Sequence, residues 1–263
     1  MLTGRTIVVT GCASGIGAET AAELRRQGAA VVGVDRNPAR GVDEHHLVDL
    51  RDPAAIDSLV DEALPGRVDG LCNIAGLPPT APPVDVMTVN VLALRRLTER
   101  LAPRLSEGSA ITNMASMAGM DWAESVELVK EFLTLDYGDD IAGFCRRHRL
   151  EEGARSYFLS KQCVQVYTMA GRWRWRDRGI RMNCLSPAAV DTPLLPDFMA
   201  RIERAAAAEK VMDRHARPDD IAGVVAFLHT DAARWFRGAN LTLDGGLSSH
   251  LLLQRHGLEP AEP

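Results

Sequence analysis

Short apolar runs alternate with longer amphipathic stretches along the chain, a pattern typical of a sheet whose strands are joined by helices. The short runs are rich in Val, Ile and Leu, like strands that are buried on both faces of a parallel sheet. They predict seven strands, at residues 6–10, 30–35, 47–50, 70–75, 110–114, 180–185 and 240–243. Helices are predicted near residues 18–26, 53–64, 84–104, 155–178 and 218–229. The alternation predicts an α/β fold with a doubly wound, Rossmann-type parallel sheet.

The segment at about residues 121–155 departs from this rhythm. It carries two amphipathic stretches, near 124–135 and 140–150. The first stretch spaces its apolar residues as one face of a helix does, at Val126, Val129, Phe132 and Leu133. We therefore expect a helical insertion between the fifth strand and the helix that follows. Three roles are open for it: covering the active site, changing how subunits pack, or extending the core.

Length and composition indicate one domain. A chain of 263 residues, 46% of them hydrophobic, suits a single large α/β domain. No internal repeat or low-complexity linker divides it. We expect this domain to span residues 1–253, with a loose C-terminal tail at 254–263.

Charge and cysteine content exclude several function classes. The net charge of −5 gives no electrostatic reason to bind nucleic acid or an anionic membrane. Arg and Trp alternate at 172–176 and could stack nucleobases, but we interpret this cluster as the solvated end of a helix. Five cysteines, an odd number, show neither a CxxC motif nor zinc spacing, so we predict a reducing compartment and no metal site. Without a signal-peptide pattern or an apolar run of about 18 residues, the chain is expected to be cytoplasmic.

A glycine-rich turn follows the first predicted strand. Gly11, Gly15 and Gly17 stand between this strand and a helix, where unpaired N–H groups and the positive helix end can hold a pyrophosphate. Glycine is needed there because a Cβ atom would block the close approach or forbid the backbone angles. An ordinary tight turn is the alternative, but the strand context favours dinucleotide binding.

Asp35 ends the second predicted strand, close to the spacing at which a carboxylate accepts hydrogen bonds from adenosine ribose. A carboxylate there would repel the 2′-phosphate of NADP(H), so we predict NAD(H) as the preferred cofactor. Arg36 complicates this prediction, because a guanidinium at this point can pair with that phosphate. Alternatively, Asp35 is only a solvated acid at a strand end.

Tyr157 and Lys161 stand four positions apart in a predicted helix, so they share one helix face. The ammonium can favour the anionic form of the phenol, which would make Tyr157 a proton-transfer group. Lowering a phenol pKa from about 10 to about 7 takes roughly 4 kcal/mol, more than one lysine normally supplies. A bound cationic nicotinamide would supply the rest. Alone, the pair is weakly diagnostic, because this spacing occurs by chance on many helices.

Together these motifs resemble the short-chain dehydrogenase/reductase family over nearly the whole chain. The matching positions are 10–17, 49–50, 73–76, Asn90, Ser116, Tyr157, Lys161, 183–187, Thr192 and 244–246. Within the family, residues 34–37, 69–76 and 181–184 are most similar to coniferyl-alcohol dehydrogenases and 3α-hydroxysteroid dehydrogenase/carbonyl reductases. The long stretch from Ser116 to Tyr157 is similar to the same subgroup.

The resemblance implies a catalytic set of Ser116, Tyr157, Lys161 and Asn90. Tyr157 would transfer the proton of the alcohol, and Ser116 would hydrogen-bond the same oxygen. Lys161 would bind the nicotinamide ribose and lower the Tyr157 pKa, and Asn90 would hold a water that links Lys161 to solvent. Alternatives are that Ser116 only caps a helix and that Asn90 only satisfies buried backbone groups.

The resemblance also implies a cofactor site along the strand ends. Its residues would be Gly11, Ser14, Gly15, Ile16, Gly17, Asp35, Arg36, Asp49, Leu50, Asn73, Ala75, Gly76, Tyr157, Lys161, Pro187, Val190 and Thr192. Asn73 could instead only connect strands by hydrogen bonds. Ala188 departs from the family's usual glycine, which narrows the backbone choices beside the nicotinamide.

Apolar side chains mark a substrate wall in the segments after Ser116 and after Thr192. The predicted substrate residues are Met117, Trp122, Ala188, Leu194, Leu195 and Phe198. Such a wall favours a hydrophobic alcohol over a phosphorylated sugar, which would need clustered Arg or Lys. Alternatively, these side chains only pack the loop against the core.

We therefore expect an NAD-dependent oxidoreductase that interconverts a hydrophobic alcohol and its carbonyl, either an aryl, coniferyl-type alcohol or a 3α-hydroxysteroid. The resemblance implies a homodimer or homotetramer. A function of another class is also open, a dinucleotide-sensing regulatory or scaffold protein that binds a partner through the insertion. The intact Ser, Tyr and Lys set argues against it, because a binding module needs no proton-transfer group.

Overall fold

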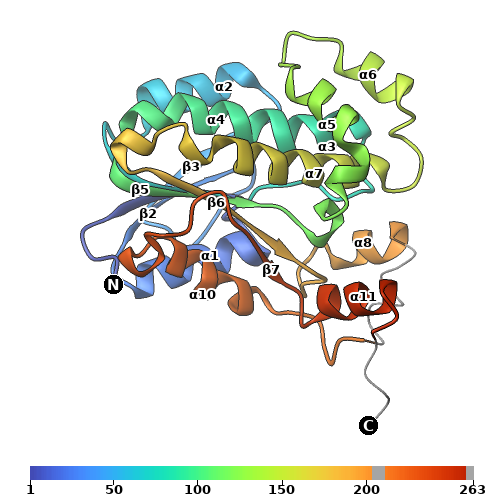
Figure 1. The fold of residues 1–263 in the computed structure, drawn as a ribbon. Helices are drawn as coiled ribbons and strands as arrows, with labels where there is room; N and C mark the ends of the chain where they lie inside the picture. The colour runs from blue at the N-terminus through green and yellow to red at the C-terminus, as the bar shows by residue number, and fades with distance from the viewer. Residues whose placement is uncertain (203–210, 259–263) are drawn as a thin grey trace.

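The computed structural model describes residues 1–202 and 211–258 and contains a parallel, seven-stranded sheet with helices on both faces (Figure 1). The strand order is β3-β2-β1-β4-β5-β6-β7. The strands are β1 (Thr6–Thr10), β2 (Ala30–Asp35), β3 (Glu44–Leu47), β4 (Val68–Asn73), β5 (Leu105–Met114), β6 (Arg181–Pro187) and β7 (Asn240–Leu243). The order reverses between β1 and β4, and this is where doubly wound sheets bind ligands. The predicted fold class is confirmed.

Two helical layers cover the sheet. One face carries α1 (Gly15–Arg26) and α10 (Pro218–Leu228), and the other carries α2 (Pro53–Ser58), α4 (Leu94–Leu101) and α7 (Arg155–Ala170) (Figure 1). Successive side chains of a strand point to opposite faces. Thus Val8 of β1 packs in the core under one layer, while Ile7 and Val9 pack in the core under the other.

The third strand lies at 44–47 rather than at the predicted 47–50. It is an edge strand whose residues Glu44 to Leu47 pair with β2 on one side, so polar side chains are tolerated and the apolar signal is weak.

Several predicted boundaries also differ. β5 begins at Leu105 instead of residue 110, and the predicted helix 155–178 ends at Ala170. The predicted helix 84–104 is divided into α3 (Pro83–Met87), a π-helical segment (Thr88–Ala93), α4 and a final 3₁₀ turn.

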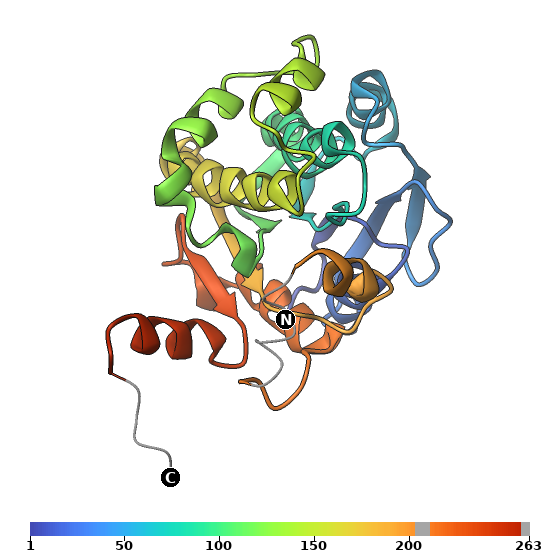
Figure 2. The ribbon, with the colours of Figure 1, turned by 90° about the vertical axis from the view of Figure 1, so that its right-hand side faces the viewer.

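The segment at 121–155 forms two helices, α5 (Val126–Leu133) and α6 (Ile141–Arg147). Their side chains Val129, Phe132 and Phe144 are completely buried in a third core cluster, and the two phenylalanine rings lie 5.1 Å apart between centroids. The cluster includes Leu159 of α7. Figure 2 shows both helices beside α7, at the top of the molecule. Of the three roles left open, the structure supports extension of the core.

In the described part of the C-terminal region, two helices were not predicted. They are α8 (Leu195–Arg201), within the apolar loop, and α11 (Leu247–Arg255), which begins directly after two glycines with positive φ. Figure 2 shows α11 standing apart from the body of the molecule. The tail predicted to be loose from residue 254 is therefore helical up to Arg255, and residues 259–263 lie outside the described part of the chain.

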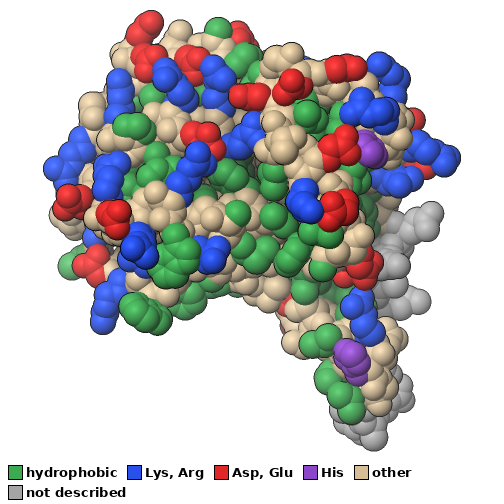
Figure 3. Space-filling view, turned by 45° about the horizontal axis from the view of Figure 1, so that its top comes forward, with side chains coloured by type: hydrophobic (Ala, Val, Ile, Leu, Met, Phe, Trp, Pro, Cys, Tyr) green, Lys and Arg blue, Asp and Glu red, His purple; other side chains and the backbone are tan. Residues whose placement is uncertain are grey.

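The distribution of surface charge and the state of the cysteines can be compared with the expectations from composition. Acidic and basic side chains are interspersed over the face shown in Figure 3. Within the basic cluster, Arg174 pairs with Glu99 at 2.6 Å, and Trp175 packs against the core, so the two do not form an open stacking surface. All five cysteines are free and buried. In the part of the chain that the structure describes, no helix is long and apolar enough to cross a bilayer.

Candidate active site

A cavity of about 1350 Å³ lies at the carboxyl ends of the strands. Its walls come from the residues that follow β1, β2, β4, β5 and β6, and from α7, α8 and α11. It spans the point where the strand order reverses, between β1 and β4. Its volume exceeds that of typical small-ligand pockets, so it has room for a dinucleotide together with a second molecule.

The glycine turn forms one end of this cavity. A Cβ atom on Gly17 would lie 2.0 Å from the carbonyl oxygen of Gly11, and a Cβ on Gly11 would lie 2.8 Å from the backbone of Ala75. Gly11 also has a φ of +74°, a backbone conformation that residues with a side chain rarely adopt. The turn leads directly into α1, whose first N–H groups have no partner within the helix. The turn therefore has the geometry of a pyrophosphate cradle.

The polar end of the cavity lies beside β2. Asp35 accepts hydrogen bonds from the backbone N–H groups of Ala13 (3.0 Å) and Asn37 (2.9 Å), which hold its carboxylate at the cavity wall. Asp49 accepts a hydrogen bond from Arg51 at 2.6 Å, and this bond lowers the Asp49 pKa. These groups suit the ribose and adenine end of a dinucleotide, so the site fits such a cofactor.

Tyr157 and Lys161 lie on consecutive turns of α7 and are both buried. The Lys161 ammonium is 5.5 Å from the centroid of the Tyr157 ring and donates a hydrogen bond to the Met114 carbonyl oxygen at 2.8 Å. Burial raises the Tyr157 pKa to about 12, against an opposing hydrogen bond with Ser116. Burial lowers the Lys161 pKa to about 8. In the protein alone, desolvation therefore dominates and the phenol is protonated at neutral pH, so the expected lowering depends on the bound nicotinamide.

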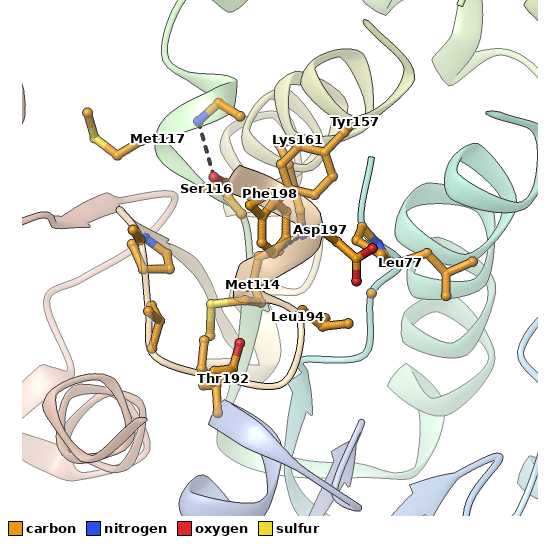
Figure 4. A pocket seen from close by; sticks show the side chains of 18 of the residues that line it. Leu77, Met114, Ser116, Met117, Tyr157, Lys161, Thr192, Leu194, Asp197 and Phe198 are labelled. Atoms are coloured by element: carbon orange, nitrogen blue, oxygen red, sulfur yellow. Dashed lines mark hydrogen bonds between the residues drawn. The ribbon is translucent and has the colours of Figure 1, made fainter. Parts of the chain in front are cut away.

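Ser116 follows β5 in an extended conformation and lines the cavity (Figure 4). Its Oγ accepts a hydrogen bond from the backbone N–H of Ala118 at 3.2 Å, so it does cap the turn Met117–Gly119. Its carbonyl oxygen accepts a hydrogen bond from Gln165 at 3.0 Å, a supporting contact that the sequence did not predict. Ser116 also forms a hydrogen bond with Tyr157. Its capping of the turn is therefore compatible with the expected role of its hydroxyl beside the Tyr157 phenol.

Most of the predicted site residues line this cavity. They are Gly11, Ser14, Gly15, Ile16, Gly17, Asp35, Arg36, Asp49, Leu50, Ala75, Gly76, Ser116, Met117, Tyr157, Lys161, Pro187, Ala188, Val190, Thr192, Leu194, Leu195 and Phe198. Three predicted residues, Asn73, Asn90 and Trp122, are not part of its wall.

Asn73 and Asn90 connect elements behind the wall. Asn73 donates hydrogen bonds to Thr98 and Asn113, both at 2.9 Å, as in the sheet-connecting alternative. Asn90 accepts a hydrogen bond from the Leu77 N–H at 2.7 Å and donates one to the Leu77 carbonyl, so it fixes the chain after β4.

Trp122 was wrongly predicted to line the substrate wall. It begins the 3₁₀ turn Trp122–Ser125, which packs against α7, and its side chain is half-buried outside the cavity.

Sequence reasoning missed several cavity residues. Leu247, Leu251 and Leu252 of α11 form part of the wall, and the spacing of Leu247 and Leu251 after a glycine pair was the available signal. Thr80 and Asp197 also line the cavity and are joined by a hydrogen bond of 2.7 Å. They are far apart in the chain, and no local pattern points to their contact.

Family models match both parts of the chain. Residues 5–127 match the model described as short chain dehydrogenase, and residues 142–248 match the one described as enoyl-(acyl carrier protein) reductase.

Related proteins cover almost the same length. The chain is 40% identical to a coniferyl-alcohol dehydrogenase of Pseudomonas sp., covering 94% of this chain and 98% of the relative. It is 31% identical to a 3-alpha-hydroxysteroid dehydrogenase/carbonyl reductase of Comamonas testosteroni, covering 92% and 96%. A 3-alpha-hydroxysteroid dehydrogenase of Pseudomonas sp. B-0831, solved with NADH, superposes with a TM-score of 0.81 at 29% identity, covering 94% and 98%. The chain therefore belongs to the short-chain dehydrogenase family.

Proposed function

We propose that the protein is an NAD-dependent oxidoreductase that interconverts a hydrophobic alcohol and the corresponding aldehyde or ketone. The observation that carries the proposal is the convergence of Ser116, Tyr157 and Lys161 at one edge of the cavity whose other end is the glycine turn. An alcohol that binds between them would meet a proton-transfer group on one side and a dinucleotide on the other.

The cofactor in this proposal is held by the glycine turn and Asp35. The turn would bind the pyrophosphate, and the Asp35 carboxylate would accept hydrogen bonds from the adenosine ribose. The same carboxylate would repel a 2′-phosphate, so NAD(H) is preferred over NADP(H), even though Arg36 also lines this end. When bound, the nicotinamide accepts hydride from the alcohol carbon or returns it.

The protein's own part in the reaction is proton transfer. The Tyr157 phenol gives its proton to the carbonyl oxygen in reduction and, as phenolate, takes the alcohol proton in oxidation. The Ser116 hydroxyl hydrogen-bonds the same oxygen and stabilises the charge that develops there. The Lys161 ammonium, fixed on Met114, supplies positive charge close to the phenolate. The Asn90 amide lies near Lys161 and, in this proposal, positions a water behind it.

The substrate in this proposal is apolar and cyclic. The outer part of the cavity gathers exposed large apolar side chains: Met120, Phe158, Leu194, Val211, Leu251 and Leu252. Such a wall favours an aryl, coniferyl-type alcohol or a 3α-hydroxysteroid over a phosphorylated sugar. The names of two relatives support the same two classes.

We also propose that the enzyme acts in the cytoplasm as a homodimer or homotetramer. Its five free, buried cysteines are compatible with a reducing compartment.

The proposal is tested by incubating the enzyme with NAD and an alcohol and following the absorbance of the NADH that forms. A parallel assay uses NADP and follows NADPH. The panel contains coniferyl, cinnamyl and benzyl alcohols, 3α-hydroxysteroids and simple secondary alcohols. We expect turnover with NAD on one of the first two classes. Tyr157→Phe should abolish turnover but retain NADH binding. An enzyme that oxidises nothing in the panel while binding NADH would favour the dinucleotide-sensing alternative.

A further inference from the structure

One carboxylate in the substrate half of the cavity has no role in the mechanism above. It belongs to Asp197, in the first turn of α8. Its oxygen accepts a hydrogen bond from the hydroxyl of Thr80 at 2.7 Å. Within residues 1–202 and 211–258, no Lys, Arg or His forms an ion pair with it.

The other acids of the cavity wall, among the residues that the structure describes, are already engaged. Asp49 and Asp85 both pair with Arg51, at 2.6 and 3.1 Å, and Asp121 pairs with Arg255 at 3.7 Å. Asp35 accepts two backbone hydrogen bonds at the cofactor end. Asp197 therefore differs from them in position and in partners, because it combines an unneutralised charge with a place among apolar side chains.

The neighbour of Asp197 on α8 contacts the proposed catalytic residue. The Phe198 ring packs edge-on against the Tyr157 ring, with 5.0 Å between centroids and 62° between planes. In Figure 4, Phe198 lies in front of Tyr157 and Lys161, and the Asp197 carboxylate points away from them toward Leu77. One helix thus places an aromatic surface beside the reacting phenol and a hydrogen-bond acceptor farther along the cavity.

We propose that Asp197 is a specificity-determining residue that accepts a hydrogen bond from a second hydroxyl of the substrate, remote from the alcohol that reacts. The substrate class is then an aryl alcohol with a phenolic hydroxyl, whose ring packs against Phe198. This inference rests on the proposed function, and it names the substrate class of the same site.

The chemistry of the carboxylate gives the reason. An ionised carboxylate only accepts hydrogen bonds, and its two oxygens offer about four acceptor positions, of which Thr80 uses one. A phenolic O–H can donate to the remaining positions. A methoxy or carbonyl oxygen at the same place has no hydrogen to donate, so it would face the carboxylate oxygens without a hydrogen bond. A site built this way selects for the hydroxyl.

A purely mechanical role is the competing explanation. The hydrogen bond between Thr80 and Asp197 joins the loop after β4 to α8, so it could simply fasten the helix over the cavity. Loss of such a fastening would impair all substrates equally. Recognition of a hydroxyl would change the ratio between substrates that differ only in that hydroxyl.

The experiment compares kcat/KM for a 4-hydroxyaryl alcohol and its 4-methoxy analogue, with NAD, in the unmodified enzyme, Asp197→Leu and Thr80→Val. We expect the unmodified enzyme to prefer the hydroxy compound by about tenfold or more, the range of a hydrogen bond to a charged group. Asp197→Leu should reduce this ratio to about one. Thr80→Val removes the fastening but keeps the carboxylate, so it should retain most of the preference.

Several outcomes would overturn the inference: no preference in the unmodified enzyme, an unchanged ratio in Asp197→Leu, or an equal loss of the ratio in both variants. NADH titration checks that each variant is folded, and Asp197→Asn, which should give an intermediate ratio, replaces Asp197→Leu if the latter does not fold. If neither alcohol is oxidised but a 3α-hydroxysteroid of the panel is, only this inference fails. If nothing in the panel is oxidised, the proposed function fails and this inference fails with it. If both are oxidised equally well, only this inference fails.

Discussion

The Lys161 ammonium is hydrogen-bonded to the Met114 carbonyl oxygen at 2.8 Å while it lies 5.5 Å from the centroid of the Tyr157 ring. The contact ties α7 to the end of β5, two residues before Ser116. The three proposed catalytic residues are therefore held by one junction between a strand and a helix. Because this junction is buried, it also controls their protonation: the phenol keeps its proton and the lysine has a pKa near 8.

The raised pKa of Tyr157 predicts opposite pH dependences for the two reaction directions. Oxidation needs the phenolate, which forms only as the pH approaches the Tyr157 pKa, about 12 without a cofactor. Oxidation should therefore accelerate as the pH rises, by up to about tenfold per unit while the phenolate is scarce, and reduction should be fastest at lower pH. Profiles of kcat/KM against pH in both directions measure this, and a flat oxidation profile would refute the assignment of Tyr157 as the base.

Replacement of Asp35 should weaken the discrimination against NADP. In Asp35→Ser the carboxylate that would repel a 2′-phosphate is gone, while Arg36 remains available to pair with that phosphate. We expect the ratio of kcat/KM with NADP to that with NAD to rise by about tenfold or more, since one charge contact is worth about 1.4 kcal/mol or more. The double variant Asp35→Ser, Arg36→Ala is the control and should lose most of this gain. An unchanged ratio in Asp35→Ser would show that Asp35 does not set cofactor choice.

Gly17→Ala should abolish dinucleotide binding or prevent folding of the turn. The added Cβ would lie 2.0 Å from the Gly11 carbonyl oxygen, a backbone atom that cannot move without opening the cradle. Gly223→Ala is the matched control, because Gly223 lies on exposed helix surface in α10 and its Cβ would meet no atom within 4 Å. The control should bind NADH normally and gain about 0.5–1 kcal/mol of stability. Titration with NADH and urea unfolding distinguish the two, and normal NADH binding by Gly17→Ala would contradict the proposed cradle.

Buried His229 should make the protein less stable in mild acid. Its Nε2 contacts Cys72 and Thr112, each at 3.2 Å, and burial lowers its pKa to about 3, with a smaller contribution from the nearby Arg181 and Arg5. Between this value and the ordinary pKa of about 6.5, the unfolded chain binds a proton that the folded chain does not.

The His229 contribution to the free energy of unfolding should therefore fall as the pH decreases from about 6.5 toward 3, by up to about 1.4 kcal/mol per unit. Urea unfolding at a series of pH values measures this slope. His229→Gln should make it shallower, whereas replacement of the exposed His256 by Gln should leave it unchanged. Equal slopes in all three proteins would contradict the prediction.

Predictions from local pattern agree with the structure where the physical cause is local. The β-branched runs predict β1 and β2 to the residue, and the glycine turn lies at the start of α1 as expected. The pattern is less informative for β3, because an edge strand need not be apolar on both faces. The insertion's helices are predicted from the spacing of Val129 and Phe132, but their function as an extension of the core depends on what they pack against.

The sequence by itself determined the doubly wound fold, the glycine turn before α1 and the shared helix face of Tyr157 and Lys161, because each follows from strand alternation, a tight turn or the helical repeat. Only the tertiary structure decided that Asn73 connects strands behind the cavity, that α11 borders it, and that Thr80 meets Asp197 from far away in the chain. It also decided the protonation of Tyr157 and Lys161, since burial depends on every segment that packs around them. Local periodicity fixes which side chains share a face, whereas desolvation and long-range contacts exist only once distant segments have packed together.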